Sequence, residues 1–148
     1  MKNAILGVRK HSGYTPCRKD LKLNGKTAFI SGSTQGIGFA IAQSLLKEGA
    51  HVIINGRSES KVAEAVQKLR ESSSGEANVS GFAADFSKVG EVNALLEQLP
   101  DIDILVNNAG IFEPKPFTEI SDDEWFRFFE VNVLSGVRLA RHFFPKML

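Results

Sequence analysis

The chain has 148 residues, of which 43% are hydrophobic, and its 18 lysines and arginines nearly balance its 17 aspartates and glutamates. One domain is expected at this length, with a core that buries about 70% of the surface exposed by the unfolded chain. The composition argues against a disordered protein, a disulfide-rich scaffold and a membrane-spanning chain. Cys17 is the only cysteine, so no internal disulfide can form and a cytoplasmic location is expected.

A basic segment opens the sequence. Residues 1–19 contain five bases and no acid, whereas the rest of the chain holds 13 bases and 17 acids. This acidic body gives no general attraction to nucleic acid or to an acidic membrane, so neither is an expected partner. We expect residues 1–20 to be a disordered extension ahead of a domain at residues 21–148. A targeting segment or a nucleic-acid-binding arm is the alternative for the extension.

Short runs rich in β-forming residues alternate with helical periods after the basic segment. Strands are expected at residues 27–31, 51–55, 78–84 and 102–106. Helices are expected from Ile37 to near Gly49, from a cap at Ser58 through Leu69, and from Val92 to Pro100. These repeats predict an α/β fold of the Rossmann type, with a doubly wound parallel sheet between two helical layers.

A capping box at Ser121–Glu124 predicts the start of a last helix, which is expected to run to Pro145. Its apolar residues form one stripe: Trp125, Phe128, Phe129, Val133 and Val137. Asn132 follows Trp125 by seven residues and is therefore expected on this stripe. A buried amide there is costly unless it is hydrogen-bonded.

A glycine-rich loop at residues 31–38 separates the first strand from the first helix. In such a loop Gly32 permits a sharp turn, Gly36 lets a pyrophosphate approach the backbone, and Gly38 allows close helix packing. The N–H groups that open the helix are suited to a phosphate. The loop lacks the Lys-Ser/Thr pair of a P-loop. An ordinary tight turn is the alternative, but the strand–loop–helix context favours dinucleotide binding.

These residues resemble the short-chain dehydrogenase/reductase family, and the resemblance covers residues 22–148. It rests on Ser31-Gly32-x3-Gly36-Ile37-Gly38, on Asp85, on Asn107-Asn108-Ala109-Gly110, and on Asn132 in Val131-Asn-Val-Leu-Ser-Gly136. The family usually has threonine at the position of Ser31. The resemblance implies an oxidoreductase that transfers hydride between a nicotinamide cofactor and a small-molecule carbonyl or secondary alcohol.

The same resemblance implies the binding residues. Cofactor contacts are implied for Gly32, Ser33, Gln35, Gly36, Ile37, Gly38, Asn108, Ala109 and Gly110, with Asp85 and Phe86 at the adenine. Asp85 is alternatively a cap of the third helix, and the Asn-Asn-Ala-Gly segment is alternatively a simple turn. Two adjacent asparagines at a strand end need hydrogen-bond partners, which favours a role in bracing the sheet and binding the cofactor.

The end of the second strand indicates which nicotinamide cofactor is bound. An acid there would bind the ribose 2′-hydroxyl of NAD, but this strand is followed by Gly56 and Arg57. The guanidinium of Arg57 suits the 2′-phosphate of NADP. We therefore expect a preference for NADP, with NAD possible and a solvated arginine as the alternative reading.

The catalytic residues that the resemblance implies are a serine, a tyrosine, a lysine and Asn132, and only the asparagine occurs at its place. Tyr14 is the only tyrosine and precedes the first strand. In the family the serine and the Tyr-x3-Lys motif follow the helix that carries Asn132. We therefore expect a fold truncated after the fourth strand and its following helix, and no activity from this chain alone. A silent dinucleotide-binding or partner-binding module and a non-functional remnant are the alternatives.

The last helix resembles one that pairs across subunits, so a homo-oligomer is implied for the intact protein. An exposed fourth strand, together with Phe128, Phe129, Phe143 and Phe144 lacking packing partners, also predicts association. The loop at residues 111–118 is expected to border the substrate, whose identity the sequence leaves open.

Overall fold

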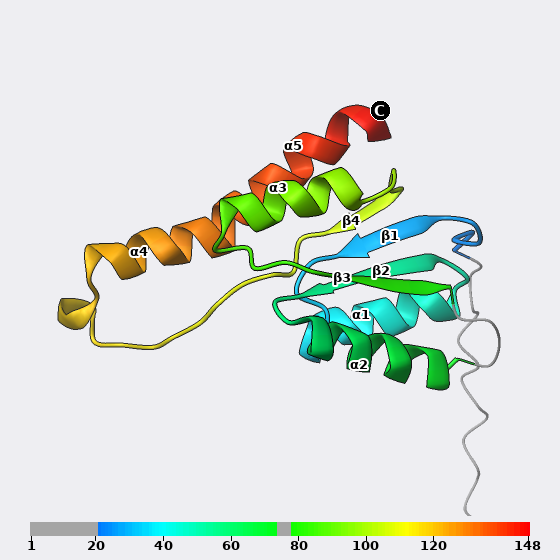
Figure 1. Ribbon diagram of the computed structural model, residues 1–148, viewed down its shortest axis with the longest axis horizontal. Helices are drawn as coiled ribbons and strands as arrows, with labels where there is room; N and C mark the ends of the chain where they lie inside the picture. The colour runs from blue at the N-terminus through cyan, green and yellow to red at the C-terminus, as the bar shows by residue number, and fades with distance from the viewer. Residues whose placement is uncertain (1–20, 74–77) are drawn as a thin grey trace, which may run out of the picture.

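The computed structural model describes residues 21–73 and 78–148, so the predicted extension at residues 1–20 lies outside the described residues. Within the described part, four parallel strands form one sheet in the order β3-β2-β1-β4 (Figure 1). The strands are β1 (Thr27–Ile30), β2 (His51–Gly56), β3 (Val79–Ala83) and β4 (Ile104–Val106). The helices between them are α1 (Gly36–Lys47), α2 (Glu59–Glu71) and α3 (Val89–Gln98). The predicted doubly wound α/β fold is confirmed.

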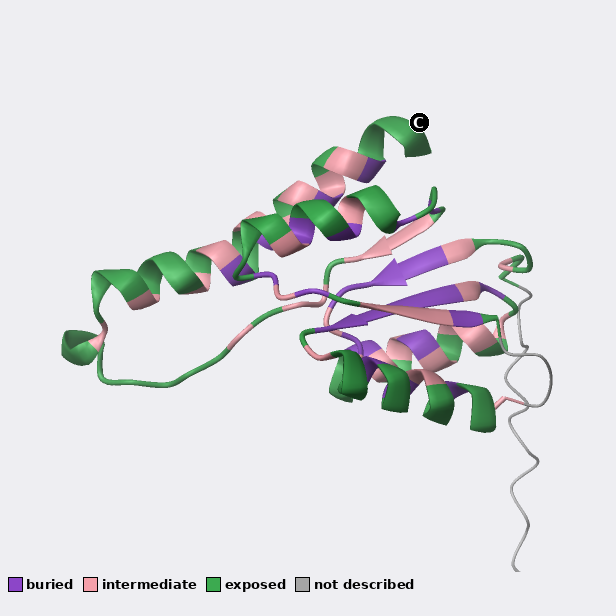
Figure 2. Cartoon of the chain, in the orientation of Figure 1, coloured by how far each residue is buried: buried purple, intermediate pink, exposed green. Residues whose placement is uncertain are grey.

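The sheet separates two helical layers, with α1 and α2 on one face and α3 and α5 (Ser135–Met147) on the other (Figure 1). Successive strand residues point to opposite faces. Phe29 accordingly joins the core beneath α3 and α5, whereas Ala28 and Ile30 join the core beneath α1 and α2. Both central strands are buried on both sides (Figure 2). This explains why their sequences are continuously apolar.

The edge strand β4 is shorter than expected and begins at Ile104 rather than residue 102. Beside its start, the carboxylate of Asp103 accepts the Thr27 backbone N–H at 2.9 Å and the Lys26 ammonium at 2.7 Å. The Asp103 side chain thus accepts the Thr27 N–H, which a backbone carbonyl of the neighbouring strand would accept in a longer β-ladder. The crossover from β3 to β4 passes β2 and β1, so the strand order reverses between β1 and β4.

The last helix differs from its prediction. The expected capping box forms, with the Ser121 hydroxyl accepting from the Glu124 N–H. The helix then comprises α4 (Asp122–Phe129), a π-helical turn η2 (Glu130–Leu134) and α5, and it continues past Pro145 to Met147. In Figure 1, α4 projects beyond the sheet.

The predicted apolar stripe of this helix is largely exposed. Of the stripe residues, Trp125, Phe129, Val133 and Val137 keep between 40% and 53% of their surface accessible, whereas Phe128 is partly buried. Phe144, further along the helix, is 62% exposed, and we call it and those four exposed residues the apolar ridge. The residues that are buried are Val131, Ser135, Leu139 and Phe143. Phe143, expected to lack partners, is fully buried in the core that includes Leu95 of α3. Only Phe143 departs from that expectation, because it lies in α5, which packs on the sheet; Phe129 and Phe144 remain exposed as expected. The stripe is exposed because α4 lies beyond the sheet.

Candidate functional site

The glycine loop lies where the sequence predicted, between the end of β1 and the start of α1. Gly32 and Gly36 have φ angles of +60° and +61°, in the left-handed region that glycine adopts without strain. A Cβ on Gly32 would lie 2.9 Å from the Ala109 Cα, whereas a Cβ on Gly36 would meet nothing within 4 Å. The first glycine therefore packs against the chain after β4, and the second faces open space.

Of the three glycines in this loop, Gly38 packs most tightly. A Cβ at this position would lie 2.5 Å from Asn108 Nδ2, 2.8 Å from the Gly32 carbonyl oxygen and 2.9 Å from the Ser33 Cα. The helix thus approaches the two loops that follow β1 and β4. The sequence predicted that Gly38 allows close helix packing. In the structure, the surface against which α1 packs there is formed by the loops after β1 and β4.

The start of α1 has the features of an anion site. Its N-cap residue, Gln35, makes no side-chain capping hydrogen bond, and Gln35, Gly36 and Ile37 are all exposed. Backbone N–H groups at an uncapped helix start have no partner within the helix and lie at the positive end of its dipole. Ser33 differs from these residues, because its hydroxyl is buried and donates to the Ile30 carbonyl at 2.6 Å.

Ser31 joins the glycine loop to the segment after β4. Its hydroxyl oxygen accepts the backbone N–H groups of Asn108 and Ala109, each at 2.9 Å, and donates to the Val106 carbonyl at 3.3 Å. The Asn108 amide returns two hydrogen bonds, to the carbonyls of Ser31 at 3.0 Å and Gly32 at 2.9 Å. The amide of Asn107 is exposed and reaches the Gly136 carbonyl at 3.4 Å. Gly110 is exposed beside Asn132.

Asp85 and Phe86 follow β3 at the same edge of the sheet. Phe86 is buried, with its ring in the core. The carboxylate of Asp85 accepts from the backbone N–H and the hydroxyl of Ser87 at 2.9 and 2.8 Å. This makes a local turn rather than a helix cap, because the N-cap of α3 is Lys88. The Glu91 carboxylate accepts the Asp85 backbone N–H at 2.8 Å.

The electrostatics of Asp85 connect it with Arg57. Partial burial acts to raise the pKa of the Asp85 carboxyl, but hydrogen bonds from Ser87 and the charges of Arg57 and Lys88 outweigh it. The pKa of Asp85 therefore lies below its usual value, and the carboxylate is ionised at neutral pH. Arg57 is exposed directly after β2. A cation and an anion thus lie close enough at the carboxyl edge of the sheet for their charges to interact.

Asn132 lies in η2 and is exposed rather than buried as expected. Its amide oxygen accepts the Ile111 backbone N–H at 2.7 Å, and its nitrogen donates to the Ile111 carbonyl at 3.1 Å. The side chain therefore pairs with the backbone of the chain that follows β4, much as a neighbouring strand would. Asn132 consequently attaches this segment to the π-helical turn.

The structure brings most of the predicted site residues to one edge. The glycine loop, Arg57, Asp85 and the Asn107–Gly110 segment each follow the carboxyl end of one of the four adjacent strands. The sequence analysis assigned no role to Asn55. Its position could have indicated one, because it is a polar residue directly after the apolar run of β2. The sequence analysis also assigned no role to Glu91. Its partner is the backbone N–H of Asp85, which lies before α3, so helical spacing does not indicate it.

The segment expected to border the substrate is fastened to α4 by charge pairs. The Lys115 ammonium donates to the Glu124 carboxylate, and Arg127 makes two hydrogen bonds to Glu113 at 2.8 and 3.1 Å. The backbone N–H and the hydroxyl of Ser121 each donate to Glu124 at 3.0 Å. The Lys115 contact, followed by the bonds from Ser121, lowers the pKa of Glu124 to about 2.

Acid is expected to release this segment. The ordinary pKa of Glu124 is 4.5, so its ionised form stabilises the fold above that pH, and this contribution is lost between pH 4.5 and about 2. Trp125 is the only tryptophan, and we expect its fluorescence to change across this range before the whole chain unfolds. In Glu124→Gln the change should be smaller, because only the Glu113–Arg127 pair then remains to be broken by acid. An identical titration of parent and variant would contradict the assignment.

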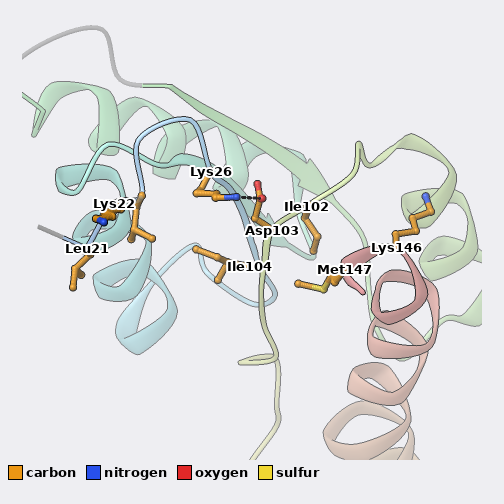
Figure 3. A pocket seen from close by; sticks show the side chains of 9 residues that line it. Leu21, Lys22, Lys26, Ile102, Asp103, Ile104, Lys146 and Met147 are labelled. Carbon is orange, nitrogen blue, oxygen red and sulfur yellow. Dashed lines mark hydrogen bonds and ion pairs between the residues drawn. The ribbon is translucent and has the colours of Figure 1, made fainter.

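A hollow of about 470 Å³ lies at the opposite, amino-terminal edge of the sheet (Figure 3). Its lining includes Lys26 with Asp103, which are paired at 2.7 Å, as well as Ile104 and Met147. It is separate from the glycine loop, so it takes no part in the candidate site.

Over residues 21–73 and 78–148, no three His, Cys, Asp or Glu side chains gather as a metal site would require. No helix in the same ranges is long and apolar enough to cross a bilayer.

This arrangement of strands and loops defines a Rossmann-type domain, and comparisons identify its family. The model of the short chain dehydrogenase family matches residues 26–148. The chain is 52% identical over 128 residues to the oxidoreductase YvaG of Bacillus subtilis strain 168, covering 86% of this chain and 48% of that protein. It is 40% identical over 116 residues to the 5-keto-D-gluconate 5-reductase of Escherichia coli K12, covering 74% and 44% respectively.

A solved structure supports the same family assignment as the sequence relatives. L-Sorbose reductase from Gluconobacter frateurii, complexed with NADPH and L-sorbose, is 37% identical with a TM-score of 0.80, covering 87% of this chain and 50% of that one. The chain therefore belongs to the short-chain dehydrogenase/reductase family. It spans about half the length of the curated relatives it matches.

Proposed function

We propose that this chain is the cofactor-binding part of an NADP(H)-dependent oxidoreductase that acts on a small-molecule carbonyl or secondary alcohol. The observation that carries the proposal is the convergence of the glycine loop, Arg57, Asp85 and Asn107–Gly110 at the carboxyl edge of the sheet. Ligands of doubly wound sheets bind at this edge, where the strand order reverses. The relative L-sorbose reductase was solved with NADPH.

The described residues fit such a cofactor. The uncapped N–H groups at Gly36 and Ile37, with open space beside Gly36, would hold the pyrophosphate. Asp85 and the backbone of Phe86 would bind the adenine, and Asn108, Ala109 and Gly110 would border the cofactor beside β4. The remaining loop residues Gly32, Ser33, Gln35 and Gly38 would shape the loop around it. The bound nicotinamide would supply or accept the hydride.

A preference for NADP over NAD has two supports. Arg57 is exposed beside the proposed adenine site, where its guanidinium can bind a 2′-phosphate. An acidic side chain at Gly56 would require Thr34 to move, because a Cβ there would lie 2.5 Å from the Thr34 Cγ2. Thr34 thus fills the space in which the carboxylate of an NAD-binding protein would begin.

Arg57→Ala is expected to weaken NADPH binding about tenfold or more, because one charge-assisted contact to phosphate is lost. NADH binding should change little. Calorimetric titration with NADPH and with NADH measures the ratio of the two affinities in each variant. Lys68→Ala, which removes an exposed cation from the far part of α2, is the matched control and should leave both affinities unchanged. Tighter binding of NADH by the parent, or unchanged NADPH affinity in Arg57→Ala, would overturn the preference.

The 148-residue chain is expected to bind NADPH without oxidising it when a ketone is added. In the proposed reaction Asn132 would hold a relay water, whereas the proton donor and its lysine would come from a Tyr-x3-Lys motif that this sequence does not contain. Absorbance at the nicotinamide band measures turnover. Activity above the background of the Asn132→Ala variant would contradict the assignment.

The intact protein is proposed to be a homo-oligomer. The apolar ridge leaves five large side chains accessible along one line of the last helix. A ridge of this kind is unusual on a monomer and typical of a surface that pairs with another molecule.

A further inference from the structure

We propose that Asn55 is a positioning residue that holds the glycine loop and the proposed adenine-binding turn at a fixed separation. This inference rests on the proposed nucleotide function. Asn55 lies near the end of β2 and is 1% exposed. Its side-chain oxygen accepts the Gly32 backbone N–H at 3.2 Å. Its side-chain nitrogen donates to the carbonyls of Phe82 at 3.1 Å and Ala84 at 3.5 Å.

A second set of bonds fastens the same residue to the glycine loop. The backbone N–H of Asn55 donates to the Ser33 hydroxyl at 3.0 Å, and the Ser33 N–H donates to the Asn55 carbonyl at 2.8 Å. The Ser33 hydroxyl donates in turn to the Ile30 carbonyl. Ser33 is fully buried. The loop is therefore attached to β2 at two consecutive residues, Gly32 and Ser33.

Each end of the Asn55 amide supports a different part of the proposed site. Gly32 opens the loop that would hold the pyrophosphate, whereas Phe82 and Ala84 immediately precede the turn at Asp85 and Phe86. The loop needs an acceptor and the end of β3 needs a donor. A primary amide supplies both from one short side chain, whereas a carboxylate offers only acceptors. Because the group is buried, water cannot replace either bond easily.

Cofactor affinity should therefore depend on Asn55 although it need not touch the cofactor. A nucleotide that spans both loops benefits when their separation is set before binding, because binding does not then have to order them. A fragment that carries the adenine and the 2′-phosphate but no 5′-phosphate, such as adenosine 2′-monophosphate, should depend less on the glycine loop than NADPH does.

The experiment compares Asn55→Ala and Asn55→Asp with the parent chain. We expect Asn55→Ala to weaken NADPH binding about tenfold and adenosine 2′-monophosphate binding less. Asn55→Asp keeps the acceptor for Gly32 but places a carboxylate oxygen against two carbonyls. Hydrogen exchange should therefore increase at residues 82–86 in both variants, and at residues 31–38 mainly in Asn55→Ala.

Val79→Ala is the matched control, because Val79 is buried on β3 at the opposite end of the sheet. It lowers stability through lost packing and should change NADPH affinity by less than about twofold. Equal losses of affinity in Val79→Ala and Asn55→Ala would overturn the inference, as would unchanged exchange at both segments in Asn55→Ala. If the parent chain binds no NADPH, the proposed cofactor function of this chain fails, and the exchange data still decide whether Asn55 positions the two loops.

Discussion

Replacing Gly38 with alanine should reduce NADPH affinity by at least about tenfold and destabilise the fold by about 1–3 kcal/mol. Alanine normally stabilises a helix relative to glycine, so the expected loss of stability comes from steric contacts with the neighbouring loops. The new Cβ would meet the Gly32 carbonyl oxygen at 2.8 Å and the Ser33 Cα at 2.9 Å. Both atoms belong to backbone, which cannot rotate aside as a side chain can. The loop must therefore shift, and the proposed phosphate site shifts with it.

Gly90 provides the matched control for this substitution. It lies in the first turn of α3, and a Cβ there would meet nothing within 4 Å. Gly90→Ala should therefore raise stability by up to about 1 kcal/mol and leave NADPH binding unchanged. Denaturant unfolding and calorimetric titration measure the two properties. If Gly38→Ala behaved as Gly90→Ala does, the close packing at the start of α1 would be refuted.

Removing the Ser31 hydroxyl should lower the stability of the fold substantially. Ser31 is 1% exposed, and its hydroxyl accepts two backbone N–H groups from the chain after β4. In Ser31→Ala both groups lose their partner. An unsatisfied buried group costs about 1–3 kcal/mol, and because these two N–H groups are part-buried we expect a combined loss of about 2–4 kcal/mol in the free energy of unfolding. NADPH affinity should fall as well, because Asn108 is no longer held beside the glycine loop.

Two further variants separate the hydrogen bonds from the loss of volume. Ser31→Thr retains the hydroxyl, which the family usually supplies as threonine, and should stay within about 1 kcal/mol of the parent. Ser44→Ala removes an exposed hydroxyl that donates to the Ala40 carbonyl and should cost less than about 0.5 kcal/mol. A Ser31→Ala protein as stable as Ser44→Ala would show that the hydroxyl does not brace the two segments.

The fold was predictable because its signals are local and repeated. The runs at β1 and β2 are apolar without interruption, which indicates burial on both faces, and the structure buries them so. The glycine spacing identified the loop at the start of α1, since two of its glycines adopt positive φ angles. Each of these conclusions depends on residues close together in the chain.

Predictions failed where distant residues decide the outcome. Asn55 is bonded to Gly32 and Phe82, which are 23 and 27 residues away, so the sequence near β2 contains no trace of either partner. Asn132 was expected on a buried face because a regular α-helical period was assumed. The π-helical turn changes that period, and the bonds to Ile111 replace burial as the means of satisfying its amide.

The π-helical turn also determines the shape of the apolar ridge. In a regular α-helix, side chains four residues apart advance by about 40° around the axis, so a row of such residues gradually winds out of line. The wider turn at Glu130–Leu134 reverses part of that winding, which keeps Trp125, Phe129, Val133 and Val137 in register. A π-helical turn holds about one residue more than an α-helical turn, so converting it to regular α-helix without removing a residue would let the row wind out of line again. The continuity of this surface is therefore a matter of helical phase, set by a single turn.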